Sequence, residues 1–239
     1  MIEVMPPKPP SSKPDAPATG ASGDIQAVVF DYGNVLSCAP TVEEWQLLAA
    51  AAGRPLEDFR RDYWLYRDGY DRAACGPVAY WQAVTRRPLD GPALGALIRL
   101  DNQQWTRINP HMLALARRLR AAGVKTAILS NIEFEMLAEL RAKFAWLSEF
   151  AVQVYSCEVR MVKPEAGIFQ ETAVRLAVEP GGILFLDDKQ RNIDGARQAG
   201  WKAFLFDTPA RQALLEQQLR ERGIALPAAE EQTAVPVNG

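Results

Sequence analysis

Histidine and cysteine are scarce in this sequence of 239 residues, and their scarcity limits its chemistry. The single histidine, His111, argues against a histidine-based triad or a multi-histidine metal site, and we expect a surface or capping role for it. The three cysteines have no paired spacing, which argues against a disulfide framework or a zinc site and favours a reducing compartment. Any chemistry is therefore expected to depend on carboxylates, hydroxyls and lysines.

Long apolar runs and an excess of basic charge are also absent. No run approaches the roughly 18 apolar residues that span a bilayer. The first 23 residues lack the apolar segment of a signal peptide. A net charge of -2 offers no attraction to nucleic acid or to an anionic membrane. We therefore expect a cytoplasmic protein with no nucleic-acid or membrane partner, whereas the sequence does not indicate an oligomeric state.

What is present is typical of a soluble globular protein. The sequence is 48% hydrophobic and 23% charged, and its length suits one domain that carries an insertion. The proline-rich segment 1–24 and the segment 226–239 have little capacity to bury apolar surface. We expect both to be disordered tails that flank the folded part.

Apolar strands alternate with helical segments over most of the folded part. The first strand is Gln26–Phe30, and the alternation resumes at Met112. Strands are expected over Val124–Leu129, Val152–Tyr155, Gly182–Leu186 and Ala203–Phe206, and helices over Met112–Ala122, Glu133–Phe144, Pro164–Leu176, Lys189–Ala199 and Pro209–Arg222. This alternation predicts an α/β fold with a Rossmann-like, three-layer core around a parallel sheet.

The segment 41–106 interrupts the alternation and contains only helical patterns. Helices are expected over Thr41–Ala52, Pro55–Tyr70, Val78–Val84 and Pro92–Trp105. We interpret this segment as an all-helical cap inserted into a core formed by residues 25–40 and 107–225.

Polar residues follow the strands at four places along the core. They are Asp31, Ser130–Asn131, Lys163 and Asp187–Asp188. Each has an ordinary alternative as a helix cap or a solvated charge. However, the carboxyl ends of parallel strands meet at one edge of a sheet, so these groups can converge there. A carboxylate nucleophile, a hydroxyl, a lysine and a second carboxylate pair together suit phosphoryl transfer.

These segments resemble the motifs of the haloacid dehalogenase superfamily of aspartate-nucleophile hydrolases. The matching segments are Phe30–Leu36 (FDYGNVL), Leu129–Asn131, Val162–Phe169 and Phe185–Asp188 with Asn192. The resemblance covers residues 24–221, and it is strongest to small sugar-phosphate phosphatases whose first motif is FDxGNVL.

The resemblance implies a Mg²⁺-dependent phosphatase that acts on a small phosphorylated metabolite, with a sugar phosphate favoured. Asp31 would attack phosphorus and form an aspartyl-phosphate, and Lys163 would neutralise phosphoryl charge. Asn192 would orient the loop that carries the fourth motif. The implied Mg²⁺ ligands are Asp31, the backbone carbonyl of Gly33, Asp187 and Asp188, and the implied phosphate-binding groups are Ser130, Asn131 and Lys163.

Gly33 departs from the pattern of the family, in which most phosphatases carry a second aspartate two residues after the nucleophile. Three explanations remain open: a substrate with a good leaving group, another acid from the cap or Asp188, or binding without turnover. The last would make the protein a non-catalytic phospholigand-binding protein. A 2-haloacid dehalogenase fits less well, because that reaction needs no cation and leaves Asp187–Asp188 as a misplaced negative charge.

The cap segment 60–72 is dense in aromatic and charged residues. On a helix, Tyr63, Arg67 and Tyr70 share one face, and Trp64, Asp68 and Asp71 share the neighbouring one. We expect Arg67, Tyr70 and Asp71 to reach the substrate, whereas Tyr63 and Trp64 are expected to pack between cap helices.

Overall fold

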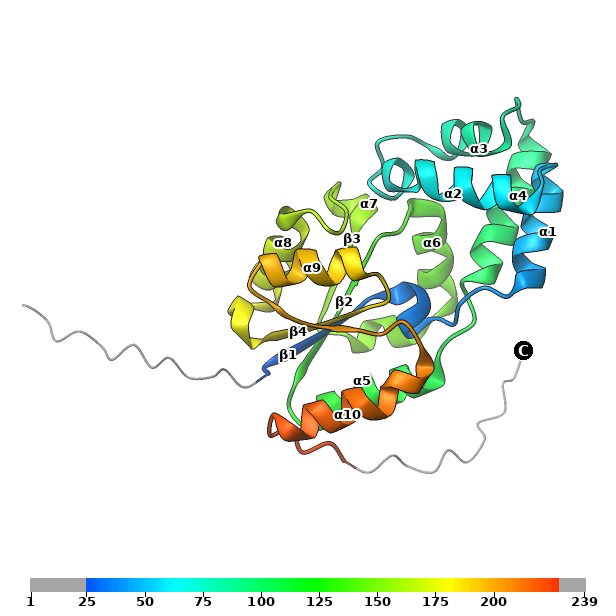
Figure 1. Ribbon diagram of the computed structural model, residues 1–239. Helices are drawn as coiled ribbons and strands as arrows, with labels where there is room; N and C mark the ends of the chain where they lie inside the picture. The colour runs from blue at the N-terminus through cyan, green and yellow to red at the C-terminus, as the bar shows by residue number, and fades with distance from the viewer. Residues whose placement is uncertain (1–24, 228–239) are drawn as a thin grey trace, which may run out of the picture.

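The computed structural model describes residues 25–227 and contains a five-stranded parallel sheet (Figure 1). The strand order is β3-β2-β1-β4-β5, so β1 is central. The strands are β1 (Ala27–Phe30), β2 (Lys125–Ser130), β3 (Val152–Tyr155), β4 (Ile183–Asp187) and β5 (Lys202–Leu205). The register pairs Phe30, the last residue of β1, with Ile128 of β2 and with Leu186 of β4, so β2 and β4 run on to Ser130 and Asp187 beyond the end of β1.

Helices cover both faces of the sheet, as the unbroken run of buried apolar residues in β1 requires. Val28 and Phe30 belong to a hydrophobic cluster with α5 and α10, whereas Ala27 and Val29 belong to a second cluster with α8 and α9 (Figure 1). The core helices are α5 (Pro110–Ala121), α6 (Phe134–Lys143), α7 (Ser156–Val159), α8 (Ala166–Leu176), α9 (Gln190–Gln198) and α10 (Gln212–Glu221). Short helical turns span Tyr32–Leu36, Ala145–Glu149, Pro180–Gly182 and Pro209–Arg211. The predicted α/β, three-layer fold is confirmed.

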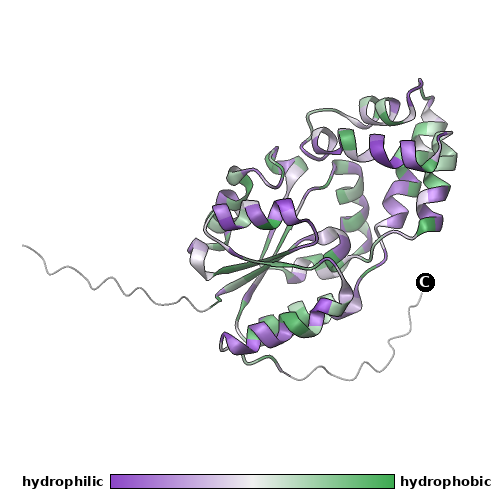
Figure 2. Ribbon diagram, in the orientation of Figure 1, coloured by the Kyte–Doolittle hydropathy of each residue, from purple (hydrophilic) through white to green (hydrophobic). Residues whose placement is uncertain are grey.

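Four further helices pack on one another beyond the carboxyl edge of the sheet (Figure 1). They are α1 (Val42–Ala52), α2 (Leu56–Asp71), α3 (Pro77–Thr85) and α4 (Gly91–Gln104), and together we call them the cap. Thr41 begins α1 with a capping box, because its hydroxyl accepts from Glu44 N–H and the Glu44 carboxylate accepts from Thr41 N–H. Figure 2 shows the contrast between the hydrophobic strands and the largely hydrophilic α2.

The two segments that connect the cap to the core lie side by side. Ser37 and Ile108 form an isolated antiparallel bridge. On either side of it, Cys38 N–H donates to Arg107 O at 2.7 Å and Asn109 N–H donates to Leu36 O at 2.8 Å. We call this paired segment the stalk.

Two helices begin later than expected. The last helix was expected from Pro209, but Pro209–Arg211 forms a separate short turn and α10 begins at Gln212. Pro164 was expected in the first turn of a helix, but α8 begins only at Ala166, because Glu165 precedes it in an extended conformation (φ -61°, ψ 135°). The segments expected to be tails, 1–24 and most of 226–239, lie outside the described residues. Among the described residues, every helix is too short or too polar to cross a membrane.

Candidate active site

The strand ends bring together the polar residues that the sequence analysis singled out. Asp31 directly follows β1, and its backbone N–H donates to Leu186 O in β4 at 2.9 Å. Ser130 is the last residue of β2, and Asp187 is the last residue of β4. All three side chains are buried, with exposures of 7%, 2% and 0%. The register of the neighbouring strands therefore brings these three residues to one edge of the sheet.

Lys163 joins two of these carboxylates. Its ammonium lies 2.8 Å from Asp31 Oδ1 and 2.7 Å from Asp187 Oδ2, and it also donates to Leu129 O at 2.9 Å. Burial alone would lower the pKa of Lys163, but the two carboxylates raise it above its usual range. The lysine is therefore a fixed positive charge, 1% exposed, at the centre of the site.

The two oxygens of Asp31 have different surroundings. Oδ1 accepts from Tyr32 N–H at 2.7 Å and holds Lys163, whereas Oδ2 receives no hydrogen bond from the described residues. Burial raises the pKa of Asp31 to about 7 against the opposing charge of Lys163, and Asp187 and Asp188 raise it further. Oδ2 is therefore a carboxylate oxygen free to react or to bind a cation.

The carboxylates of Asp31, Asp187 and Asp188 could hold a divalent cation. One oxygen from each lies within 4.8 Å of the others. The donors are all oxygen atoms, as Mg²⁺ prefers. The residues present therefore fit the cation.

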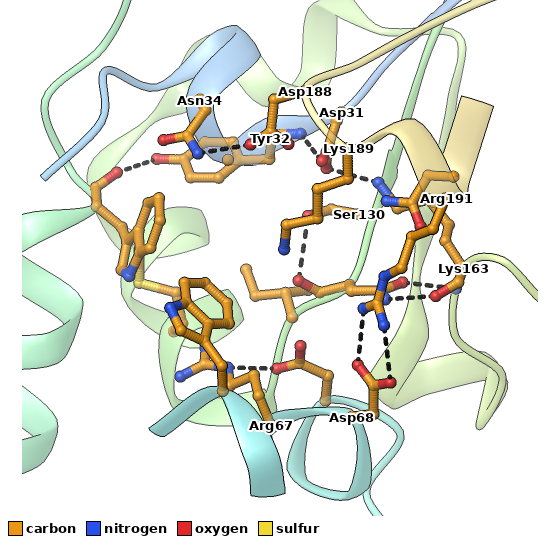
Figure 3. Close-up of a pocket in the computed structure, with 18 residues that line it drawn as sticks. Asp31, Tyr32, Asn34, Arg67, Asp68, Ser130, Lys163, Asp188, Lys189 and Arg191 are labelled. Carbon is orange, nitrogen blue, oxygen red and sulfur yellow. Dashed lines mark hydrogen bonds and ion pairs between the residues drawn. The ribbon is translucent and has the colours of Figure 1, made fainter. Parts of the chain in front are cut away.

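Two asparagines hold the fourth-motif carboxylates. Asn192 Nδ2 donates to both oxygens of Asp187, at 2.9 and 3.0 Å, which is the positioning role expected for it. Asn34 Nδ2 donates to Asp188 Oδ2 at 2.8 Å (Figure 3). Asn34 has a left-handed backbone (φ 60°), and its buried Oδ1 has no partner among the described residues.

Ser130 and Asn131 lie beside Lys163. The hydroxyl of Ser130 makes only a long contact, 3.5 Å, to Asn131 O, so it can turn to a ligand. The Asn131 amide pairs with the backbone of Lys163, accepting from its N–H at 2.8 Å and donating to its carbonyl at 3.1 Å. Asn131 thus also fixes the loop that carries the lysine, a role the sequence did not indicate.

These groups open into one cavity of about 270 Å³ between the core and the cap (Figure 3). From the core it is lined by Asp31, Tyr32, Gly33, Asn34, Ser130, Asn131, Ile132, Met136, Lys163, Asp188, Lys189, Arg191 and Asn192, and from the cap by Trp64, Arg67, Asp68, Asp71 and Trp105.

The cavity contains two of the three cap residues that were expected to reach the substrate. Arg67 and Asp71 line it, but Tyr70 does not. Tyr70 instead donates its hydroxyl to Glu135 at 2.9 Å and stacks on Tyr80. The face of α2 that meets the cavity is the neighbouring one, because Tyr63 and Tyr70 pack against aromatic residues of α3. Trp64, which was expected to pack between cap helices, touches Trp45 of α1 but is 40% exposed and lines the cavity.

Arg67 is itself the centre of a buried charge cluster. Its guanidinium donates to Asp71 at 2.8 Å, to Asp101 at 3.0 Å and to Glu133, and also to the hydroxyl of Tyr63. Glu133 immediately precedes α6 of the core, so the cluster joins cap and core. Burial raises the pKa of Glu133 to about 8 against the opposing charge of Arg67, and Asp101 and Asp71 raise it further. We call this set the Arg67 cluster.

Two cations that the sequence did not indicate line the cavity, from the loop after β4 and the start of α9. The ammonium of Lys189 lies 4.5 Å from the centre of the Trp64 ring and has no carboxylate partner among the described residues. Arg191 reaches across to the cap and pairs with Asp68 at 3.1 Å (Figure 3). Both residues closely follow Asp187–Asp188 in the sequence, and this position could have predicted that they lie near the site.

Trp105 lies over Gly33, the position at which the family pattern led us to expect an acid. A Cβ atom on Gly33 would lie 3.6 Å from the Trp105 ring, an ordinary contact distance. The indole therefore covers the space beside Gly33, and a proton donor has to come from elsewhere in the cavity.

Comparison with known proteins identifies the family of the chain and several of its relatives. The sequence model of the haloacid dehalogenase-like hydrolases matches residues 25–200. A phosphatase from Mycobacterium tuberculosis is 28% identical over 190 residues, which covers 77% of this chain and 88% of that protein. (S)-2-haloacid dehalogenase 1 from Pseudomonas sp. strain CBS-3 is 31% identical over 190 residues, covering 74% of this chain and 82% of the dehalogenase.

A solved structure shares the fold. It is a family enzyme from Bacteroides thetaiotaomicron, crystallised with magnesium and inorganic phosphate, that superposes with a TM-score of 0.61 at 19% identity. The superposition covers 76% of this chain and 93% of that enzyme.

Proposed function

Because the chain belongs to the haloacid dehalogenase-like hydrolase family, we propose that it is a Mg²⁺-dependent phosphatase of a small phosphorylated metabolite. One observation carries the proposal: Asp31 and Lys163 share a cavity with the Ser130 hydroxyl and with Asp188, and the buried carboxylate of Asp187 lies close to those of Asp31 and Asp188. That combination supplies a nucleophile, a fixed positive charge and a cation site within one pocket.

The Mg²⁺ ligands in this proposal are Asp31, the Gly33 carbonyl, Asp187 and Asp188. When bound, the ion reduces the repulsion between an anionic phosphate and the anionic nucleophile. Asn192 and Asn34 already hold the two carboxylates of the fourth motif, so little reordering is needed.

The residues of the chain perform the transfer in two stages. The Ser130 hydroxyl, the Asn131 N–H and the Lys163 ammonium hold the phosphoryl oxygens, and the free Oδ2 of Asp31 attacks phosphorus. The bond from phosphorus to the ester oxygen breaks and the alcohol departs, which leaves an aspartyl-phosphate. Water then attacks this phosphorus, and the bond to Asp31 breaks to release phosphate and restore the carboxylate. Lys163 stays beside Oδ1 throughout and stabilises the negative charge on the transferring group.

The size of the cavity favours a small substrate. Its volume of about 270 Å³ lies at the lower end of the range of about 300–1,000 Å³ for small-molecule sites. Its cap wall combines two tryptophans with charged groups, which suits an organic part with apolar faces and hydroxyls, such as a sugar.

The three cysteines are free thiols, in keeping with a cytoplasmic location.

The first test measures phosphate release from a panel of sugar phosphates with and without Mg²⁺. We expect Mg²⁺-dependent turnover that Asp31→Asn abolishes, because the amide cannot act as the nucleophile. Asp194→Asn is the matched control, since Asp194 is exposed on α9 and does not line the cavity. If Asp31→Asn is as fast as the wild type, the proposal fails, and a slow wild type that still binds the phosphates points to a binding protein.

A second measurement tests the nucleophile without turnover. Beryllium fluoride with Mg²⁺ mimics an aspartyl-phosphate, so it should raise the melting temperature of the wild type but not of Asp31→Asn. An equal shift in both proteins would contradict the assignment of Asp31.

A 2-haloacid dehalogenase is the second candidate, favoured by one feature of the site. Lys163 balances Asp31 and Asp187 directly, so the nucleophile is partly neutralised without a cation. Asp188 weighs against this candidate, because it adds a third carboxylate that needs a positive partner. Chloride release from (S)-2-chloropropionate in the presence of a chelator would favour the dehalogenase and overturn the phosphatase.

A further inference from the structure

An alkoxide leaves phosphorus slowly unless it receives a proton as its bond to phosphorus breaks. Hydrolysis of an alkyl phosphate therefore needs an acid beside the leaving oxygen. We infer that Asp71, on the cap helix α2, is this acid. The inference rests on the proposed function, because it assigns the proton donor of that same reaction.

The leaving oxygen lies on the cap side of the cavity. In a phosphoryl transfer the attacking and leaving oxygens are roughly in line with phosphorus. Asp31 lies on the core side, and Arg67 and Asp68 of α2 lie across the cavity from it (Figure 3). A proton donor to the leaving group must therefore belong to the cap or to the rim of the cavity.

Asp71 is the carboxylate on that side with a free oxygen. Within the described part of the chain, four carboxylates line the cavity, and two of them, Asp31 and Asp188, belong to the nucleophile and cation sites. Both oxygens of Asp68 face Arg191 in a half-exposed ion pair. Asp71 holds Arg67 with Oδ1 alone, and Oδ2 receives no hydrogen bond from the described residues.

The backbone fixes Asp71 against the phosphate-binding loop. The buried hydroxyl of Ser156 donates to Asp71 O at 2.7 Å and accepts from Ile132 N–H at 2.8 Å. Ile132 directly follows Asn131, so one serine links the acid to the loop that holds the phosphoryl group. The position of Asp71 is therefore set by the core as well as by α2.

The surroundings of Asp71 allow it to hold a proton. Its side chain is almost fully buried, and burial raises its pKa. Arg67 and Lys189 oppose this shift, and Asp68 adds to it. The guanidinium of Arg67 also forms ion pairs with Asp101 and Glu133, so its positive charge is shared among three carboxylates and is not available to Asp71 alone.

The proton and the electron pairs balance over the two stages. In the first, Asp31 Oδ2 forms its bond to phosphorus, the bond to the leaving oxygen breaks, and that oxygen takes the proton of Asp71 and departs as an alcohol. In the second, the Asp71 carboxylate takes a proton from water as the water oxygen attacks phosphorus. The bond to Asp31 breaks, phosphate leaves, and both carboxyl groups return to their starting states.

The test compares leaving groups in Asp71→Asn. For an alkyl phosphate such as glycerol 3-phosphate, kcat/KM should fall by about 10²–10⁴-fold, the usual contribution of a positioned acid. For p-nitrophenyl phosphate it should fall by less than about tenfold, because the phenolate leaves without a proton. The variant should also release a burst of p-nitrophenolate, since the second stage lacks its base.

Asp101→Asn is the matched control for a merely structural effect. Asp101 pairs with the same Arg67 but does not line the cavity, so its loss should change both substrates alike. An equal fall for both substrates in Asp71→Asn, or no fall for the alkyl phosphate, overturns the inference. If Asp31→Asn is inactive at the same time, the proposed function stands, whereas an active Asp31→Asn overturns both.

The wild-type protein provides a second measurement that needs no variant at Asp71. Across a series of aryl and alkyl phosphates, kcat/KM should depend only weakly on the basicity of the leaving group, because the acid neutralises its charge. A steep dependence would contradict a proton donor in the cavity.

Discussion

At the scale of single residues, the site depends on the burial of Lys163. An ammonium that is 1% exposed is tolerated because two carboxylates face it and Leu129 O accepts its remaining proton. The loop that carries it is in turn held by Asn131 and lies against α9 at Gly195. The position of the charge is therefore set by close packing behind the cavity.

Gly195 allows this packing, so its replacement should disturb it. A Cβ atom there would lie 2.7 Å from Pro164 Cβ and 2.9 Å from Pro164 O. We expect Gly195→Ala to lower the free energy of unfolding by about 1–3 kcal/mol, the usual range for overpacking, and to reduce activity by moving Lys163. Chemical denaturation and phosphate release measure the two effects.

Gly69→Ala provides the contrast. Gly69 lies inside α2, and no atom of another described segment lies within 4 Å of the position that a Cβ atom would take there. Alanine should therefore raise the free energy of unfolding by about 0.5–1 kcal/mol, because it loses less backbone freedom than glycine when the helix forms. A loss of stability in Gly69→Ala equal to that in Gly195→Ala would contradict the packing argument.

At the scale of elements, α2 shows what the sequence could and could not predict. The spacing of apolar, aromatic and charged residues predicted the extent of this helix and the presence of aromatic and charged residues along it. The apolar runs likewise predicted the strands whose ends carry Asp31 and Asp187. Which stripe of α2 meets the cavity depends on α3, whose aromatic residues pack against Tyr63 and Tyr70. Lys189 and Arg191 were not predicted as site residues. Near the start of a helix, the sequence pattern of a basic residue that faces a cavity is the same as that of one that faces solvent.

The Arg67 cluster could not be predicted either, because it joins residues far apart in the chain. Tertiary packing brings α2, α4 and the start of α6 together around one guanidinium. Three buried carboxylates share a single arginine, so the cluster keeps a proton that the unfolded chain releases. This makes the contact between cap and core sensitive to pH.

Glu133→Gln should remove part of that sensitivity. The folded protein holds a proton on Glu133 up to about pH 8, whereas the unfolded chain releases it near pH 4.5, so this group lowers stability as pH rises between those values. The wild type should lose more stability from pH 5 to pH 8 than the variant, and the variant should melt higher at pH 8. Thermal unfolding across pH measures the difference.

Glu139→Gln is the control, because Glu139 is exposed on the same helix. Equal pH dependence in the wild type and Glu133→Gln would contradict the prediction. The groups that face Glu133 are Tyr63, Arg67, Tyr70 and Asp71 from α2, Asp101 from α4 and Cys157 from α7.

At the scale of the whole molecule, the ion pairs between cap and core are of two kinds. The Arg67 cluster is buried, whereas Arg191–Asp68 and Arg72–Glu165 are ion pairs that remain largely in contact with water. Solvent screens the exposed pairs, so they contribute little to the free energy of unfolding. Among these ion pairs, the buried cluster is therefore expected to contribute most to the attachment of the cap.

Arg67→Met and Arg191→Met should differ accordingly. The first leaves three buried carboxylates without their partner and should lower the free energy of unfolding by about 3–5 kcal/mol, whereas the second should change it by less than about 1 kcal/mol. Urea denaturation measures both. Similar losses in the two variants would show that the exposed pairs hold the cap as firmly as the cluster does.

The stalk has a consequence for how such a molecule can be assembled and altered. Because Ser37 and Ile108 are already paired, the folded cap presents its two ends to the core at the separation of neighbouring strands. With the cap folded, the entropic cost of joining β1 to β2 is close to that of a tight hairpin, and smaller than that of a long flexible insert. The cap is in this sense an interchangeable module: a longer, shorter or differently folded insert could replace it at the same two residues while the pairing of β1 with β2 stays the same.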